Sequence, residues 1–165
     1  MTPDYRKYYF LEGYLEEVRN NFKRGYLTPE EFFCIVIWKA NRAKTKIKKR
    51  LLLKNNLKDA VKELTRDIFK EKGIDKLTIL LNKWGFMLPM ATAILTVLYP
   101  EEFSVYDIRV REQLGSENVY SANKYFSEFL PKVKQTAKDK NLSLRDADRY
   151  LWGKSFYESL EVFLK

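Results

Sequence analysis

The chain has 165 residues, enough for one domain with a hydrophobic core and too few for two comfortable ones. It contains no histidine and a single cysteine, which excludes an internal disulfide, a four-thiolate iron–sulfur cluster and imidazole catalysis. A conventional zinc site also lacks its usual ligands, and we expect no metal and no cofactor. The longest apolar run, residues 86–99, contains a proline and is shorter than the roughly 20 residues of a membrane-spanning helix.

The formal net charge is +9, and all of the excess falls in one stretch. No acidic residue occurs between Glu31 and Asp59, whereas that stretch holds nine of the 31 Lys and Arg residues; the other 22 balance the 22 acidic residues. Such a concentration of positive charge is typical of a surface that binds a polyanion. A solvated basic helix without a partner is the alternative interpretation.

Two helices are expected in the first third of the chain. The first covers residues 4–24 and ends at Gly25. The sequence Thr28-Pro29-Glu30-Glu31 predicts the start of the second, with Thr28 as N-cap and Glu31 as its capping-box partner. The apolar residues expected to face inward from the first helix are Tyr8, Leu11, Leu15 and Val18.

The second helix is expected to continue to about Asn55 with two different halves. Its first half, Phe32 to Trp38, is apolar on all sides and should be central. Its second half should carry a row of basic side chains on one face: Lys39, Arg42, Lys46 and Lys49.

Two helices joined by a tight turn are predicted next, after a helix over residues 58–72. Leu77, Leu80 and Trp84 recur at helical spacing, the turn follows at Gly85-Phe86-Met87, and a second helix runs from Leu88 to Leu98. We expect this unit, at about residues 75–98, to pack its two apolar faces together.

The remaining chain also predicts helices. One should begin at Asp107 and close at Gly115, one should cover about residues 120–138 with a kink at Pro131, and Ser143 should start another. Residues 150–152 should dock on the core before a last helix, residues 154–164. No convincing strand is present, so the fold class is all-α: residues 1–165 as one compact domain of about eight or nine helices.

The turn and Asp107 together resemble motifs of a known family. Residues 85–91 (GFMLPMA) and 106–110 (YDIRV) resemble the L-P-G-V-G-x-K-T-A and V-D-T-H-V segments of the helix–hairpin–helix DNA glycosylases, in a form without the iron–sulfur cluster. Pro89 falls where bifunctional members have lysine, and Asp107 lies 18 positions later, the separation that the family shows. Residues 37–41 (IWKAN) more weakly resemble the DNA-facing L-L-S-x-Q segment, with Asn41 at the glutamine position.

The resemblance implies base excision with Asp107 as the catalytic carboxylate. Cleaving a base from its sugar passes through an oxocarbenium-like state, which a nearby carboxylate stabilises while it orients a water. A helix N-terminus favours the ionised form of such a carboxylate. A plain helix N-cap is the alternative role for this residue.

The same resemblance implies DNA-binding roles for further residues. Backbone N–H groups of the turn and basic side chains would hold the DNA backbone: Lys39, Asn41, Arg42, Lys46, Lys49, Lys83, Gly85, Phe86, Met87 and Leu88. Aromatic side chains would form the base pocket or a wedge, although core packing is the alternative for each: Trp38, Trp84, Tyr99, Tyr106 and Trp152.

Because Pro89 offers no amine for a Schiff base, simple hydrolysis without strand cleavage is predicted. The expected partner is double-stranded DNA with a damaged or mismatched base, bound by a monomer. The first ten residues show no apolar signal region, so we expect an intracellular, nucleoid-associated protein. A non-catalytic helix–hairpin–helix module that binds DNA or RNA remains the alternative, and the identity of the base stays open.

Overall fold

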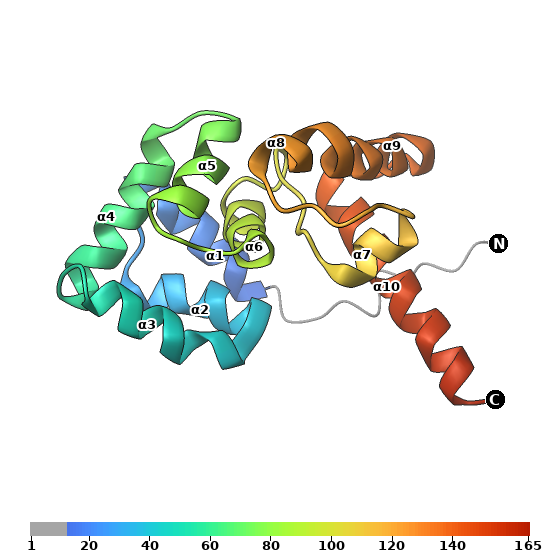
Figure 1. Cartoon of the computed structure of the whole chain (residues 1–165), viewed down its shortest axis with the longest axis horizontal. Helices are drawn as coiled ribbons and strands as arrows, with labels where there is room; N and C mark the ends of the chain where they lie inside the picture. The colour runs from blue at the N-terminus through green and yellow to red at the C-terminus, as the bar shows by residue number, and fades with distance from the viewer. Residues whose placement is uncertain (1–12) are drawn as a thin grey trace.

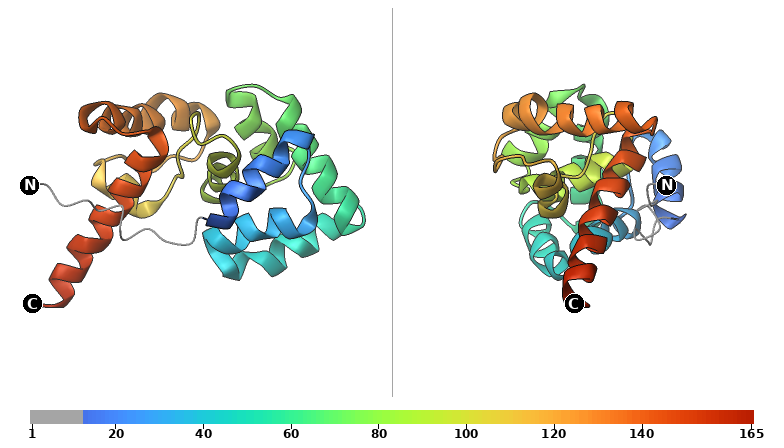
Figure 2. Two further views of the ribbon diagram at one scale, coloured as in Figure 1. Left: turned by 180° about the vertical axis from the view of Figure 1, so that it is seen from behind. Right: turned by 90° about the vertical axis from the view of Figure 1, so that its right-hand side faces the viewer.

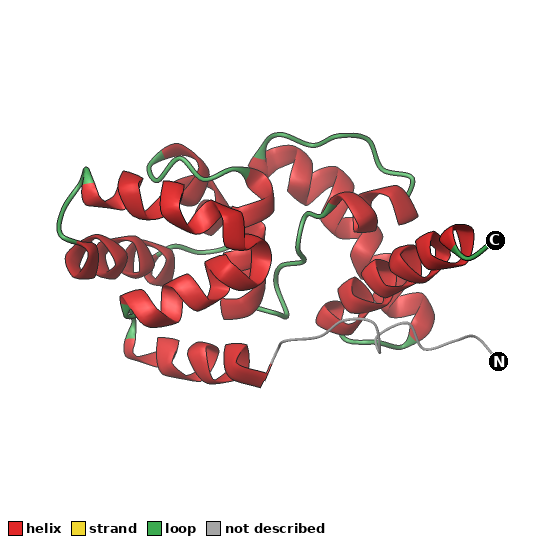
Figure 3. Ribbon diagram, turned by 90° about the horizontal axis from the view of Figure 1, so that it is seen from below, coloured by secondary structure: helices red, strands yellow, loops and turns green. Residues whose placement is uncertain are grey.

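The structure, a computed structural model, describes residues 13–165, and all regular elements in this part of the chain are helical (Figures 1 and 3). The all-α prediction is therefore confirmed for the described residues, whereas Tyr8, Leu11 and the start of the first predicted helix lie outside them. The elements are α1 (Gly13–Asn21), η2 (Phe22–Arg24), α2 (Pro29–Ala40), η3 (Asn41–Ala43), α3 (Lys44–Leu52), α4 (Leu57–Lys70), α5 (Ile74–Asn82), α6 (Leu88–Leu98), α7 (Ile108–Gln113), α8 (Ala122–Lys124), η4 (Tyr125–Phe129), α9 (Leu130–Lys140) and α10 (Leu144–Phe163).

Helix α6 lies at the centre of the molecule. Its sequence has no charged side chain, and all of its residues except Pro89 are buried. Helices α1, α2 and α5 pack around it, while α7 and α9 pack against α10 in a second group beside the first (Figure 1). One hydrophobic core runs through both groups, from Leu15 in α1 to Leu151 in α10. Figure 2 shows the C-terminal part of α10 extending beyond the other described helices.

The prediction of a single helix from Pro29 to Asn55 is wrong. The chain leaves helical geometry at Ala40 (φ −160°, ψ 92°), passes through the 3₁₀ turn η3 and resumes as α3. A straight helix over those residues would be about 40 Å long and would leave the core. The break instead lets α3 pack on α2 and α4, which buries Ile47 and Leu51.

Residues 150–152 join the hydrophobic core, as predicted: Tyr150 and Leu151 are buried in it and Trp152 packs against it. The separate last helix predicted over residues 154–164 is wrong, because α10 continues without a break from Leu144 to Phe163 and Gly153 is buried within it. The expected disturbance at Pro131 takes the form of a π-helical turn, η4, just before α9. Proline has no N–H to donate, so the hydrogen bonds of the preceding turn shift in register. In residues 13–165 no helix is both long and apolar enough to cross a membrane.

A buried carboxylate, Glu31, connects the start of α2 with the end of α1. The predicted capping box is confirmed: the Glu31 N–H donates to Thr28, and the Thr28 N–H donates to Glu31 Oε2 at 2.9 Å. Asn21 Nδ2 donates to Oε1 at 2.9 Å, and the Arg24 guanidinium pairs with Oε2. Burial raises the pKa of Glu31, but the hydrogen bonds from Thr28, Arg24 and Asn21 outweigh it, so the pKa lies below its ordinary value.

Replacing Glu31 with Gln is expected to lower the free energy of unfolding at pH 7 by about 2 kcal/mol, because charge-assisted hydrogen bonds are lost. The pKa is depressed in the folded state, so this stabilisation exists above the unfolded pKa of about 4.3 and disappears as the pH falls through the folded value. Urea unfolding should show a difference between Glu31→Gln and the wild type that shrinks from pH 7 to pH 3. An equal difference at both pH values would contradict this account.

Candidate active site

A buried, irregular segment, residues 103–106, delivers Asp107 to the start of α7. The segment lies in neither a helix nor a sheet, so its N–H groups must find other acceptors. Three consecutive N–H groups donate to side chains of three different elements: Ser104 to Tyr125 Oη (2.9 Å), Val105 to Asp148 Oδ2 (3.3 Å) and Tyr106 to Thr92 Oγ1 (2.9 Å). These bonds fix the position of the next residue, Asp107, relative to η4, α10 and α6.

Asp107 caps α7, as predicted, and also makes an ion pair. Its Oδ1 accepts a hydrogen bond from the Arg109 N–H at 2.9 Å, and its Oδ2 lies 2.7 Å from Lys39 Nζ. The two side chains of the pair are only 19% and 16% exposed, for Asp107 and Lys39 respectively. The structure thus brings together two predicted site residues that are 68 positions apart.

Lys39 does not belong to the row of basic side chains predicted for one long helix. It stands one residue before the break at Ala40, and its side chain pairs instead with Asp107, the N-cap of α7. Asn41 and Arg42 follow in η3, and Lys46 and Lys49 lie exposed on α3. Asn41 Oδ1 accepts a hydrogen bond from Lys44, whereas Arg42, Lys46 and Lys49 form no ion pair with a described acidic residue.

A second ion pair, Arg145–Asp148, lies behind the first. Asp148 is 1% exposed, and it accepts hydrogen bonds from Arg145 Nη1 and from the Val105 N–H. Burial raises the pKa of the Asp148 carboxyl, and the lowering by Arg145 and the Val105 N–H does not fully offset it. The charges of Asp107 and Lys39 also act on Asp148, so the two pairs form one electrostatic unit.

Of the five predicted aromatic side chains, Trp38 lies beside this unit, and Trp152 lies against the Arg109 side chain. The Arg145 guanidinium carbon is 5.5 Å from the centre of the Trp38 ring. Trp152 stacks on Phe156, with ring centres 5.6 Å apart and planes 6° from parallel, and Arg109 lies over both rings.

The other three aromatic candidates lie in the core or at its edge. Trp84 is 3% exposed, and its Nε1 donates to Asp67 at 3.0 Å. Tyr106 is 8% exposed, and its hydroxyl accepts a hydrogen bond from the Val119 N–H at 2.8 Å. Tyr99 is half-buried, with its ring edge-on to Phe22 at 5.9 Å. Packing accounts for each of these three rings.

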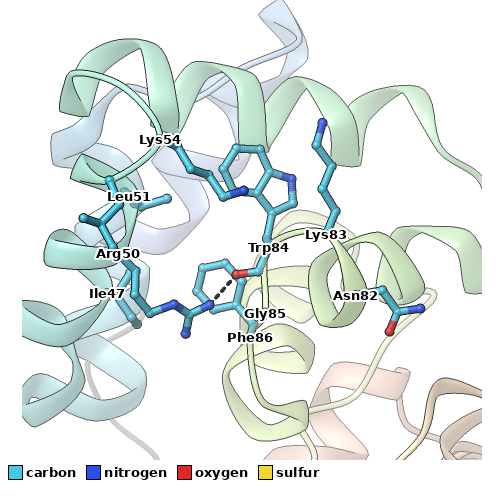
Figure 4. A pocket seen from close by; sticks show the side chains of 10 residues that line it. Ile47, Arg50, Leu51, Lys54, Asn82, Lys83, Trp84, Gly85 and Phe86 are labelled. Atoms are coloured by element: carbon cyan, nitrogen blue, oxygen red, sulfur yellow. Dashed lines mark hydrogen bonds between the residues drawn. The ribbon is translucent and has the colours of Figure 1, made fainter.

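The turn between α5 and α6 has one residue in the left-handed region, Gly85 (φ 66°). Met87 has a φ of −81°, so a glycine is not required there. The Arg50 side chain donates to the Trp84 carbonyl oxygen and lies close to Gly85, where an added Cβ would be 2.7 Å from an Arg50 nitrogen (Figure 4). Lys54 lies 5.0 Å from the centre of the Trp84 ring.

Several backbone donors of this turn are available to a ligand. The Phe86 N–H donates to the Leu80 carbonyl, but the N–H groups of Gly85, Met87 and Leu88 donate to no acceptor among residues 13–165. Lys83, the cation predicted to assist them, is already engaged by Asp67 (2.6 Å) and Glu63 (3.3 Å). These hydrogen bonds, above all the one to Asp67, raise the pKa of Lys83.

Sequence reasoning missed four residues of this region: Arg50, Thr92, Arg145 and Asp148. Arg145 and Asp148 are three residues apart and could have been recognised as a helical ion pair. Thr92 gave no signal, because an internal helix threonine usually bonds only to its own helix; here Thr92 Oγ1 donates to the Leu88 carbonyl and accepts from Tyr106.

In the described part of the chain, no group of three or more His, Cys, Asp or Glu side chains is arranged to hold a metal ion. Comparisons with protein-family models, with curated proteins and with solved structures find no match for this chain. Its function therefore has to be inferred from its own residues.

Replacing Arg145 with Met is expected to lower the free energy of unfolding at pH 7 by about 3–5 kcal/mol, because Asp148 stays buried without its counter-ion. The matched control is Lys154→Met, which removes an exposed pair with Glu158 on the same helix and should cost less than about 1 kcal/mol. Since burial raises the pKa of Asp148, protonation should relieve the cost as the pH falls through that pKa. A loss equal to that of the control in urea unfolding would show that the pair does not support the site.

Proposed function

We propose that the protein is a DNA glycosylase that hydrolyses the bond between a damaged or mismatched base and its sugar, with Asp107 as the essential carboxylate. The observation that supports this most is the position of Asp107. It caps α7, it follows a segment bonded to the first turns of α6 through Thr92, and it meets the basic stretch at Lys39. The segments that resemble the helix–hairpin–helix glycosylases therefore lie together in space.

The Lys39–Asp107 pair supports this chemistry directly. Loss of the base leaves positive charge on the sugar ring, which a carboxylate stabilises best in a site of low polarity. Asp107 already holds one positive charge, the Lys39 ammonium, at 2.7 Å. On binding of an extruded nucleotide, the cationic sugar would take the place of this ammonium, and the flexible lysine side chain would turn to a phosphate.

The balance of the reaction requires only water. The base departs with the electron pair of the glycosidic bond, a water oxygen bonds to the sugar carbon, and Asp107 takes one proton from that water. Passing this proton through solvent to the departed base anion neutralises the base and restores the carboxylate. Pro89, at the exposed start of α6, has no amine to form a covalent intermediate. The product is then an abasic site in an intact strand.

The DNA backbone would lie on the turn and on the basic side of the molecule. The free N–H groups of Gly85, Met87 and Leu88 can bind a phosphate at the start of α6. Arg42, Lys46 and Lys49 are exposed and free of described acidic partners, so they can contact further phosphates. Binding should weaken steeply with salt, since each phosphate contact releases counter-ions.

A second candidate function is a non-catalytic module that binds DNA or RNA. The observation that favours it is that Asp107 is already paired with Lys39 and mostly buried, which also suits a purely structural ion pair. Both functions require nucleic-acid binding, and they differ in whether a base is released.

Asp107→Asn is expected to reduce base release at least 100-fold while DNA affinity changes little, because the amide cannot stabilise a cation or take a proton. The assay uses a panel of duplexes, each with one damaged or mismatched base, and alkali to reveal abasic sites. Asp75→Asn, at the exposed first turn of α5, is the matched control and should keep full activity. Base release by Asp107→Asn at the wild-type rate, or none by the wild type on any duplex, would support the binding module.

The wild type is expected to form no covalent adduct with its substrate duplex under borohydride, and strands should break only after alkali. Denaturing gel electrophoresis would separate such an adduct from free DNA. An adduct with the wild type would refute simple hydrolysis and point to Lys39, the amine that contacts Asp107.

A further inference from the structure

A cavity of about 580 Å³ lies between the turn after α5 and the loop before α8, and Asp107 does not line it. No Asp, Glu, Lys or Arg side chain lines this cavity. Its walls combine apolar groups with side-chain amides and one exposed phenol, and the residues that matter are Asn82, Met87, Pro89, Asn118, Tyr120 and Asn123. A cavity of this chemistry suits an uncharged ligand that has flat apolar faces and polar edges.

A second, cationic cavity of about 380 Å³ adjoins the neutral one. Arg50, Lys54 and Lys83 line it together with Gly85, and both cavities share Asn82 and Phe86 (Figure 4). Arg50 and Lys54 make no ion pair with a described acidic residue, unlike Lys83. A ligand that spans the two would therefore be neutral at one end and anionic at the other.

Two large side chains at the neutral cavity are exposed to solvent. Met87 is 77% exposed and Tyr120 is 82% exposed. The flat ring of Tyr120 and the polarisable side chain of Met87 can stack on a nucleobase whatever its identity.

The amides supply polar groups for the edge of a base. The side chains of Asn82 and Asn123 form no hydrogen bond with another described residue. Asn118 Oδ1 accepts a hydrogen bond from Arg111 Nη1 at 2.5 Å, which holds this side chain in place and leaves its NH₂ group free to donate. Amide groups pair readily with the donors and acceptors of base edges.

We propose that the neutral cavity binds one unpaired nucleobase, with the adjoining phosphate on the turn and beside Arg50 and Lys54. This inference rests on the proposed nucleic-acid substrate and adds a second nucleotide subsite, separate from Asp107. The protein would then bind DNA in which one nucleotide next to the excised base is unpaired.

Two fluorescent oligomers of equal length and charge test the proposal: an eight-residue thymidine oligonucleotide and an eight-residue abasic tetrahydrofuran backbone. Fluorescence anisotropy should show that the wild type binds the thymidine oligomer about 5- to 160-fold more tightly, the range that stacking of one base supplies. Tyr120→Ala should remove most of this preference and leave the affinity for the abasic oligomer unchanged. Tyr14→Ala, a half-exposed tyrosine on α1 that does not line the cavity, is the matched control and should keep the preference.

Equal affinity of the wild type for the two oligomers, or an unchanged preference in Tyr120→Ala, would contradict the proposal that the cavity binds a nucleobase. It would leave the proposal that DNA binds through its phosphates unaffected. Failure of both oligomers and of lesion-containing duplexes to bind at low salt would overturn the inference and the proposed function together.

Discussion

The geometry of the candidate site depends on how one buried segment satisfies its backbone. Residues 104–106 cross the interior outside any helix, and each of their N–H groups would be costly to bury without an acceptor. A tyrosine hydroxyl, a carboxylate and a threonine hydroxyl from three separate elements accept these bonds. Because packing fixes each of the three acceptors, the segment has one position, and this determines where Asp107 lies.

Electrostatics then sets the character of that position. Val105 bonds to Asp148, Asp148 pairs with Arg145, and Asp107 pairs with Lys39, so two carboxylates and two cations share a small, mostly dry region. The arrangement keeps a carboxylate close to a positive charge, which is the environment that the proposed reaction, with its cationic transition state, would use.

The sequence predicted the features that local chemistry determines. Thr28 and Ser143 start helices because their hydroxyls cap them, and Asp107 caps α7 in the same way. The two helices around Gly85 also followed from apolar spacing and a glycine in a left-handed turn.

Long-range pairings were beyond such reasoning. The break at Ala40 depends on where α3 finds its partners, and the continuity of α10 through Gly153 depends on packing on α7 and α9. Nothing local in residues 103–106 indicates that their N–H groups bond to side chains of α6, η4 and α10. For Trp84 and Tyr106, aromatic identity alone could not separate a base-binding ring from a core ring.

The central claim is that Asp107 stabilises positive charge on a sugar in bound DNA. The most direct measurement compares the affinity of the protein for two duplexes, one with a cationic pyrrolidine in place of the damaged nucleotide's sugar and one with neutral tetrahydrofuran there. The account predicts that the cationic duplex binds at least 100-fold more tightly, as transition-state mimics do, and that this preference depends on Asp107. Equal affinity for the two duplexes would contradict it.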